Sequence, residues 1–113
     1  MNFNVSEKSD NVVVIKTPER FTVEFSSEFK DILNNLVQEQ KCKIVIDLTA
    51  TKYMDSSGLG AIVSRIAATR ANQGDIRLAK PSKFVEELLD LTQLMRILKI
   101  FKSTKSAVNS FKE

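Results

Sequence analysis

Two stretches of the sequence decide the fold: Lys43-Ile44-Val45-Ile46-Asp47-Leu48, and then Met54-Asp55-Ser56-Ser57-Gly58-Leu59-Gly60. The first is an apolar, β-branched run that ends in an acidic residue, which is typical of a buried parallel strand. Beyond the second, apolar residues recur at the i, i+3, i+4, i+7 spacing of a helix face, at Leu59, Ile62, Val63 and Ile66. The polar turn therefore lies where a strand passes into a helix N-terminus, a place rich in unpaired N–H groups and positive dipole.

The rest of the chain alternates strand and helix patterns. The first predicted elements are a hairpin of strands at 3–5 and 12–15, a helix at 25–37 and a strand at 42–48. A helix from about 58 to 72 follows, which Gly74 ends, and then a strand at 75–79. The last predicted elements are a short helix capped by Ser82, a strand at 97–101 and a helix that begins at Ser103. This order predicts an α/β fold with about four helices on a mostly parallel sheet of about five strands, the N-terminal hairpin forming an antiparallel edge. Nearly all of the phenylalanines and leucines are assigned to the core.

Composition bounds the class of protein. The 113 residues are 42% apolar and 27% charged, which fits one globular domain over residues 1–113. No apolar run is long enough to cross a membrane, and we expect no membrane association. The one cysteine, Cys42, excludes an internal disulfide and fits a cytoplasmic location. Because Cys42 lies between two lysines, it is either an ordinary small residue or, as the minor alternative, a reactive thiol.

The charged residues and the absence of histidine narrow the function further. Without histidine the chain lacks the commonest general base and metal ligand. Residues 1–50 hold six Lys and Arg against eight Asp and Glu, whereas residues 51–113 hold eleven against six. The basic half lacks the interleaved aromatic cluster of a nucleic-acid site, so we expect no nucleic-acid partner. A protein partner with an acidic surface accounts for the excess charge.

Three roles are open to the hydroxyls of the polar turn: nucleophile, phosphate acceptor and helix cap. A nucleophile is disfavoured because the glycine two residues before the serine and a histidine partner are missing. A phosphate-cradling loop is disfavoured because Gly-Lys-Ser/Thr is missing. Capping is plausible for Asp55, Ser56 and Ser57 alike, and we expect Ser57 to cap a helix that begins near Gly58.

The run from Ile46 to Gly60 resembles the signature of bacterial anti-sigma factor antagonists, single-domain members of the STAS superfamily. The similarity extends over essentially the whole chain, including the passage from Leu91 to Ser103. The resemblance implies a STAS-like fold and a regulatory protein that is not an enzyme and holds no cofactor. It also implies that an anti-sigma factor, which is itself a serine kinase, phosphorylates Ser56. The unphosphorylated form then binds that kinase and releases the sigma factor, and a PP2C-type phosphatase resets the switch.

The resemblance also implies a partner-binding surface, made of Thr22, Met54, Asp55, Ser56, Ser57, Gly58, Leu59 and Gly60. Family members commonly carry Gly-Glu-(apolar)-Asp before the first helix, whereas this chain has Glu19-Arg20-Phe21-Thr22, so Thr22 replaces an acid. We expect Gly58 and Gly60 to admit the partner close to the backbone, and alanine at either position to keep or raise stability. Two alternatives stay open: an accessory subunit that binds a transport ATPase, and a partner-switching regulator whose output is not transcription.

Overall fold

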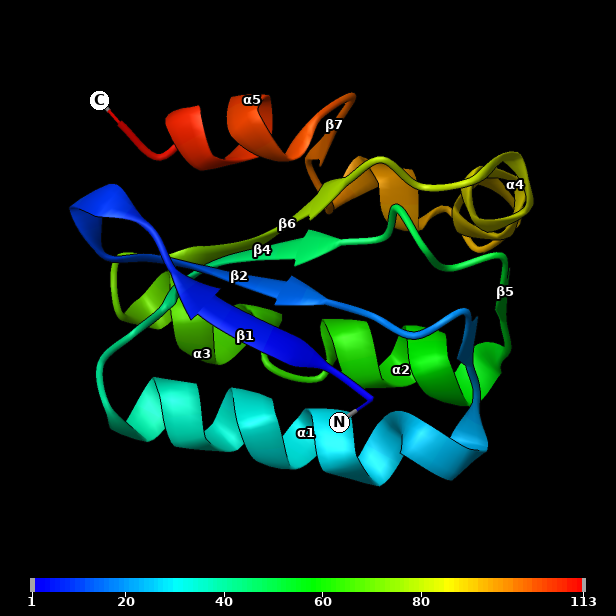
Figure 1. Ribbon diagram of the computed structural model, residues 1–113, viewed down its shortest axis with the longest axis horizontal. Helices are drawn as coiled ribbons and strands as arrows, with labels where there is room; N and C mark the ends of the chain where they lie inside the picture. Colours follow the sequence, from blue (N-terminus) through cyan, green and yellow to red (C-terminus); the bar gives the residue numbers. More distant parts are fainter. Residues whose placement is uncertain (1, 113) are drawn as a thin grey trace.

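The computed structural model describes residues 2–112, and a five-stranded sheet runs through its middle (Figure 1). Its strands lie in the order β1-β2-β4-β6-β7 and are β1 (Asn4–Glu7), β2 (Val12–Lys16), β4 (Lys43–Asp47), β6 (Asp75–Ala79) and β7 (Ile100–Phe101). The β1–β2 pair is antiparallel and every other pair in this sheet is parallel. The predicted sheet and its hairpin edge are therefore confirmed, although the last strand is shorter than predicted.

Helices cover both faces of this sheet. One face carries α1 (Val23–Gln38), α2 (Ser56–Val63) and α3 (Ile66–Ala71), and the opposite face carries α5 (Thr104–Asn109) (Figure 1). The helix α4 (Lys83–Leu91) lies beyond the carboxyl ends of the parallel strands. Two 3₁₀ turns, η1 (Ser9–Asn11) and η2 (Leu94–Arg96), complete the elements. None of these helices is both long and apolar enough to cross a bilayer.

The second predicted helix is in fact two helices, α2 and α3. The backbone N–H and the hydroxyl of Ser64 both donate to the carbonyl of Ala61, at 3.3 and 2.7 Å. Arg65 then leaves helical geometry, with φ −123° and ψ 17°. A serine that bonds to its own turn competes with the regular helix ladder, which ends α2 although the apolar spacing continues.

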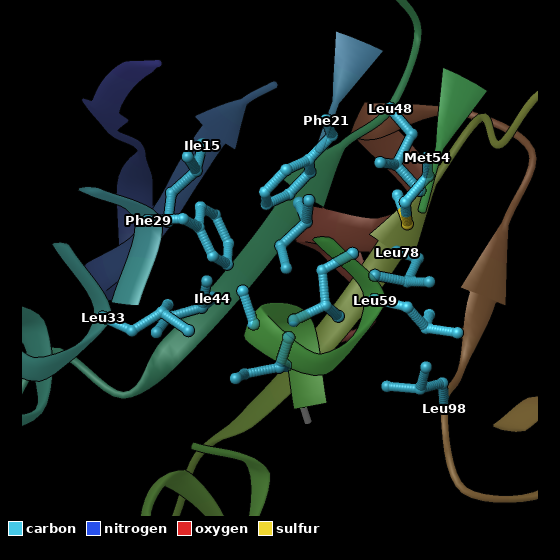
Figure 2. Packing of buried hydrophobic residues seen from close by; sticks show 14 of the residues in the cluster. Ile15, Phe21, Phe29, Leu33, Ile44, Leu48, Met54, Leu59, Leu78 and Leu98 are labelled. Atoms are coloured by element: carbon cyan, nitrogen blue, oxygen red, sulfur yellow. The ribbon is translucent and has the colours of Figure 1, made fainter. Parts of the chain in front are cut away.

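The core is divided by the sheet into a large and a small layer. On the face of α1 and α2, the rings of Phe3, Phe21 and Phe29 pack with centroids 5.0–5.3 Å apart (Figure 2 shows two of them). On the other face, small side chains of the central strands meet Ala107 and Val108 of α5. Burial on both faces explains the uninterrupted apolar strands.

Two large apolar side chains are exceptions to the expectation that nearly all phenylalanines and leucines lie in the core. Phe84 exposes 44% of its surface and Leu91 exposes 82%. Both lie on α4, whose inward positions are taken by the fully buried Val85 and Leu89. The apolar face of α4 is thus wider than the part of it that packs against the core.

Three helices end in the same way, with glutamine in the left-handed conformation: Gln40 after α1, Gln73 after α3 and Gln93 after α4 have φ of 61–64°. After α3, Gln73 N–H donates to the carbonyl of Arg70 and Gly74 N–H to that of Thr69, which is the Schellman pattern. Gly74 stands at the end of the helix as predicted, but the left-handed residue is Gln73. The φ of Gly74 is not positive, and the glycine is required because a Cβ there would overlap the Cys42 carbonyl.

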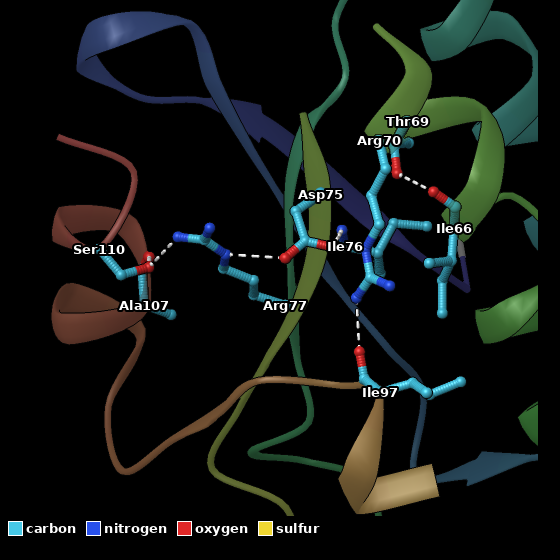
Figure 3. Close-up of polar contacts among 9 residues, drawn as sticks. All are labelled: Ile66, Thr69, Arg70, Asp75, Ile76, Arg77, Ile97, Ala107 and Ser110. Atoms are coloured by element: carbon cyan, nitrogen blue, oxygen red, sulfur yellow. Dashed lines mark hydrogen bonds and ion pairs between the residues drawn. The ribbon is translucent and has the colours of Figure 1, made fainter. Parts of the chain in front are cut away.

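The start of β6 is fixed by a buried carboxylate that two arginines link to elements on both faces of the sheet (Figure 3). Asp75 is 5% exposed and accepts from Arg70 Nε of α3 at 2.9 Å and from Arg77 Nε of β6 at 3.1 Å. Arg70 also donates to the Ile97 carbonyl before β7, and Arg77 donates to Ser110 Oγ beyond α5 at 2.7 Å. These bonds tie α3, β6, β7 and the C-terminal segment together.

A second, smaller sheet lies at the opposite end of the molecule, where the parallel strands finish. It consists of β3 (Arg20–Phe21) and β5 (Tyr53–Met54), which are parallel and pair Arg20 with Tyr53 and Phe21 with Met54. This pairing brings the segment before α1 beside the segment before α2. The sequence did not predict these strands because two residues are too few to show a period of two.

Candidate functional site

The turn before α2 is organised by Asp55. Asp55 has extended backbone geometry, φ −102° and ψ −177°, and its Oδ1 accepts from the N–H of Gly58 at 3.0 Å. This is the geometry of an N-cap residue, and α2 begins at Ser56. The prediction that Ser57 caps a helix starting near Gly58 is therefore wrong, because Ser57 already lies inside the first turn.

The same carboxylate also serves the neighbouring helix. Oδ2 of Asp55 accepts from the backbone N–H of Val23, the first residue of α1, at 3.1 Å. Thr22 occupies the N-cap position of α1, but its side chain makes no capping bond. One carboxylate thus joins two helix N-termini, through a bond between residues that lie 32 positions apart in the sequence. Sequence patterns gave no signal of this second bond, since it depends on the pairing of β3 with β5.

The predicted site residues divide into a surface group and a buried group. Ser56 and Gly60 are exposed, and Thr22, Asp55 and Ser57 are half-buried. Because β3 pairs with β5, Thr22 lies beside the turn as expected. The buried group is Met54 at 1%, Leu59 at 5% and Gly58, which support the turn from inside.

The two glycines of the turn have different roles. A Cβ at Gly58 would overlap the carbonyl oxygen of Phe21 and approach Met54 Cγ to 3.1 Å. Gly58 is needed so that β3 can pass close to α2, and the prediction that alanine there keeps stability is overturned. A Cβ at Gly60 would meet nothing within 4 Å, so that position stays open to a partner.

The electrostatic setting of Ser56 combines two helix N-termini with the Asp55 carboxylate. The N-termini of α1, with 16 residues, and α2, with 8, converge on the Asp55 carboxylate. Free N–H groups and the positive ends of helix dipoles stabilise negative charge within the first turn by about 0.3–1 kcal/mol. A phosphate on Ser56 would therefore be compatible with the fold.

The minor alternative of a reactive Cys42 is not supported. Cys42 is only 4% exposed, and desolvation by burial raises the pKa of its thiol. The side chain is thus a protonated, inaccessible part of the packing at the start of β4.

Comparison with known proteins identifies the family. The family model of the STAS domain matches residues 5–107. The chain belongs to the STAS domain family. A curated relative of this STAS domain is the anti-sigma F factor antagonist of Paenibacillus polymyxa, 26% identical over 110 residues that cover 96% of this chain and 94% of that protein.

Solved STAS structures share the architecture over almost their full length. The crystal structure of TM1081 from Thermotoga maritima is 27% identical, with a TM-score of 0.89 and coverage of 98% of this chain and 95% of that one. The Bacillus cell fate determinant SpoIIAA in its phosphorylated form is 17% identical, with a TM-score of 0.79 and coverage of 97% and 99%. The second likeness establishes the fold alone. In this STAS domain, Asp55 and Ser56 lie at the start of α2.

Proposed function

We propose that this STAS domain is an anti-sigma factor antagonist controlled by phosphorylation of Ser56. The observation that carries the proposal is the placement of Ser56: an exposed hydroxyl, directly after a carboxylate that fixes the backbone of its turn. Two facts about similar proteins support it. The relative from Paenibacillus polymyxa is named an anti-sigma F factor antagonist, and SpoIIAA has a structure in a phosphorylated form.

The switch acts on the complex and leaves the fold intact. The unphosphorylated form binds an anti-sigma factor that is also a serine kinase, and the sigma factor is released. Phosphorylation adds about −1.5 to −2 charges at pH 7. The helix N-termini accommodate this charge, but a partner surface matched to a neutral hydroxyl does not. Like-charge contacts at an interface cost several kcal/mol, which is on the order of 100-fold or more in affinity. A PP2C-type phosphatase restores the binding form.

Each residue of the turn has a role in this scheme. Asp55 positions Ser56, while Thr22, Ser57 and Gly60 border it on the surface. Met54, Gly58 and Leu59 hold the turn from the core side. Thr22 adds no charge beside Ser56, so the only carboxylate in the predicted surface is that of Asp55. The partner supplies the ATP and the catalytic groups.

Phosphopeptide mapping after incubation with the cognate kinase and ATP tests the assignment. We expect the label on Ser56, loss of labelling in Ser56→Ala, and retained labelling in the matched control Ser57→Ala. Ser56→Asp should melt within a few degrees of the wild type and lose kinase binding, because the helix N-terminus accepts an anion and the interface does not. Labelling that persists in Ser56→Ala and disappears in Ser57→Ala would overturn the proposal.

The alternative of an accessory subunit for a transport ATPase makes a different prediction for the same variants. Binding to such an ATPase would not be controlled by phosphorylation of Ser56, so Ser56→Asp would bind as tightly as the wild type. A partner-switching regulator with a different output would use the same surface as the main proposal and would be distinguished by what the partner releases.

A further inference from the structure

An aromatic and cationic cluster lies beside the Ser56 turn. The rings of Tyr53 and Phe84 have centroids 5.1 Å apart, and the guanidinium carbon of Arg20 lies 4.6 Å from the Tyr53 centroid. The cluster joins three elements that are distant in the sequence: β3, β5 and α4. We propose that Arg20, Tyr53 and Phe84, here called the Tyr53 anchor, form a second contact for the partner that binds at Ser56. The inference rests on the proposed function and specifies where that partner is held.

Strand geometry places the anchor and the Ser56 turn on one continuous surface. Successive side chains of a strand point to opposite faces. Phe21 and Met54 point into the core, so their predecessors Arg20 and Tyr53 point outward. Thr22 and Asp55 follow at the next outward positions of the same two segments. A partner that reaches Ser56 therefore meets the Tyr53 anchor next.

The Ser56 turn alone is too small for a stable complex. Its surface group contains only Thr22, Asp55, Ser56, Ser57 and Gly60. A specific protein interface contributes about 20–30 residues and about 800 Å² from each partner. The partner must extend past the turn, and the side of β5 and α4 offers the exposed aromatic surface. Phe84 exposes 44% of its surface there, although a large aromatic side chain is usually buried.

The composition and rigidity of the anchor suit an interface centre. Tyrosine, phenylalanine and arginine are enriched at protein interfaces, and a few such residues carry most of the binding energy. Stacking of Arg20 on Tyr53 and of Tyr53 on Phe84 holds these side chains in place before binding, which reduces the entropy cost of ordering them. The chemistry fits an anti-sigma factor that presents an apolar side chain to Phe84 and a carboxylate to Arg20.

Titration calorimetry of the purified cognate anti-sigma factor against the unphosphorylated chain tests the anchor. We expect Phe84→Ala and Arg20→Ala each to weaken binding by about tenfold or more. Arg20→Lys should weaken it less, because it keeps the charge and loses the planar stacking. Met95→Ala is the matched apolar control, since Met95 is 45% exposed on η2, and Lys105→Ala on α5 is the matched charge control. Both controls should bind as the wild type does.

The outcomes of these titrations distinguish a failure of the Tyr53 anchor from a failure of the phosphorylation switch. Binding of Phe84→Ala and Arg20→Ala at wild-type affinity would overturn the anchor, as would an equal loss in Met95→Ala. A loss in Phe84→Ala that comes with a large fall in melting temperature, while Arg20→Ala binds normally, would make the pair structural and also overturn it. If the anchor variants bind weakly while Ser56→Asp binds normally, the anchor holds and the phosphorylation switch fails. If the wild type binds no anti-sigma factor, both proposals fail.

Discussion

Two carboxylates hold opposite ends of this domain by different means. Asp55, at the carboxyl end of the parallel sheet, accepts only from backbone N–H groups, those of Val23 and Gly58. Asp75, at the other end, accepts from one backbone N–H and from two guanidinium groups. Asp55 is half-buried on the surface that we propose for the partner, whereas Asp75 is 5% exposed.

The difference shows that backbone hydrogen bonds can hold a site rigid without ion pairs at that site. Backbone donors fix the Asp55 turn, and none of the ion pairs among the described residues involves its carboxylate. A new phosphate on Ser56 then remains visible to a partner as a change in net charge. At Asp75 the arginines neutralise the carboxylate, and the network of Figure 3 serves to connect elements. We therefore expect substitutions at Asp75 to act on stability and substitutions near Asp55 to act mainly on binding.

The largest loss of stability should follow Asp75→Ala. The change leaves two arginines without their anion, and removing one member of a buried ion pair costs about 3–5 kcal/mol. Because the Arg70 side chain is 43% exposed, water compensates part of the loss, and about 3 kcal/mol is expected. Denaturant unfolding measures this, with Asp31→Ala on the exposed side of α1 as a control. If Asp75→Ala lowers the free energy of unfolding by less than Asp55→Ala does, the proposed contrast between the two ends of the domain is wrong.

Gly58→Ala should be the next most damaging change. Its Cβ would overlap the Phe21 carbonyl, and overpacking of this kind costs about 1–3 kcal/mol. Binding should fall as well, because β3 must move away from α2. Thermal unfolding together with titration against the partner measures both effects. Unchanged stability would mean that β3 yields easily and is no rigid support for the turn.

Asp55→Ala should lower stability less and binding more. Loss of a helix cap costs about 0.5–2 kcal/mol, and here one change removes the bonds to both Gly58 and Val23. Asp55→Asn should lie between the two, because its amide keeps one acceptor and turns a donor toward the other N–H. Melting temperatures and the rate of Ser56 phosphorylation measure the series. If the asparagine variant is phosphorylated at the wild-type rate, the two-helix bond does not position Ser56.

Gly60→Ala should have the smallest effect on the fold, and of opposite sign. Alanine is favoured over glycine in a helix by about 1 kcal/mol, and nothing lies within 4 Å of the added Cβ. We expect a melting temperature equal to or above that of the wild type, together with weaker partner binding. Unchanged affinity would remove Gly60 from the interface and leave the turn and the Tyr53 anchor as the proposed contacts.

Local patterns predicted the parts of the fold that depend on local chemistry. The strand β4 was predicted because burial on both faces demands uninterrupted apolar residues, and β6 was predicted from its alternation of apolar and polar residues. Ser82 and Ser103 were predicted as caps, and each accepts the expected bond from the third residue of its helix. Before α4, Ser82 is the single capping residue ahead of the apolar pattern, so that choice was unambiguous.

The parts that were missed depend on contacts between distant segments. At Asp55-Ser56-Ser57 three capping residues compete, and the choice follows from the extended backbone that β5 imposes on Asp55. The bond from Val23 to Asp55 joins segments that the pairing of β3 with β5 brings together, and the stacking of Tyr53 on Phe84 joins β5 to α4. The residues of the candidate turn were therefore predictable from the sequence. The pairing of β3 with β5 that supports the turn, and the Tyr53 anchor beside it, were not.

The left-handed glutamines that end three of the helices are positions at which substitution can change the stability of the domain. Left-handed geometry costs a residue with a Cβ about 1–2 kcal/mol, which glycine at the same positions would avoid. Gln40, Gln73 and Gln93 lie outside the predicted partner-binding set, so the chain can gain or lose stability there independently of recognition. Stability that is lost through substitutions in the proposed partner surface can thus be restored at these distant positions. Partner-binding assays on Gln→Gly variants, combined with destabilising changes in the turn, would measure how much stability these positions can restore.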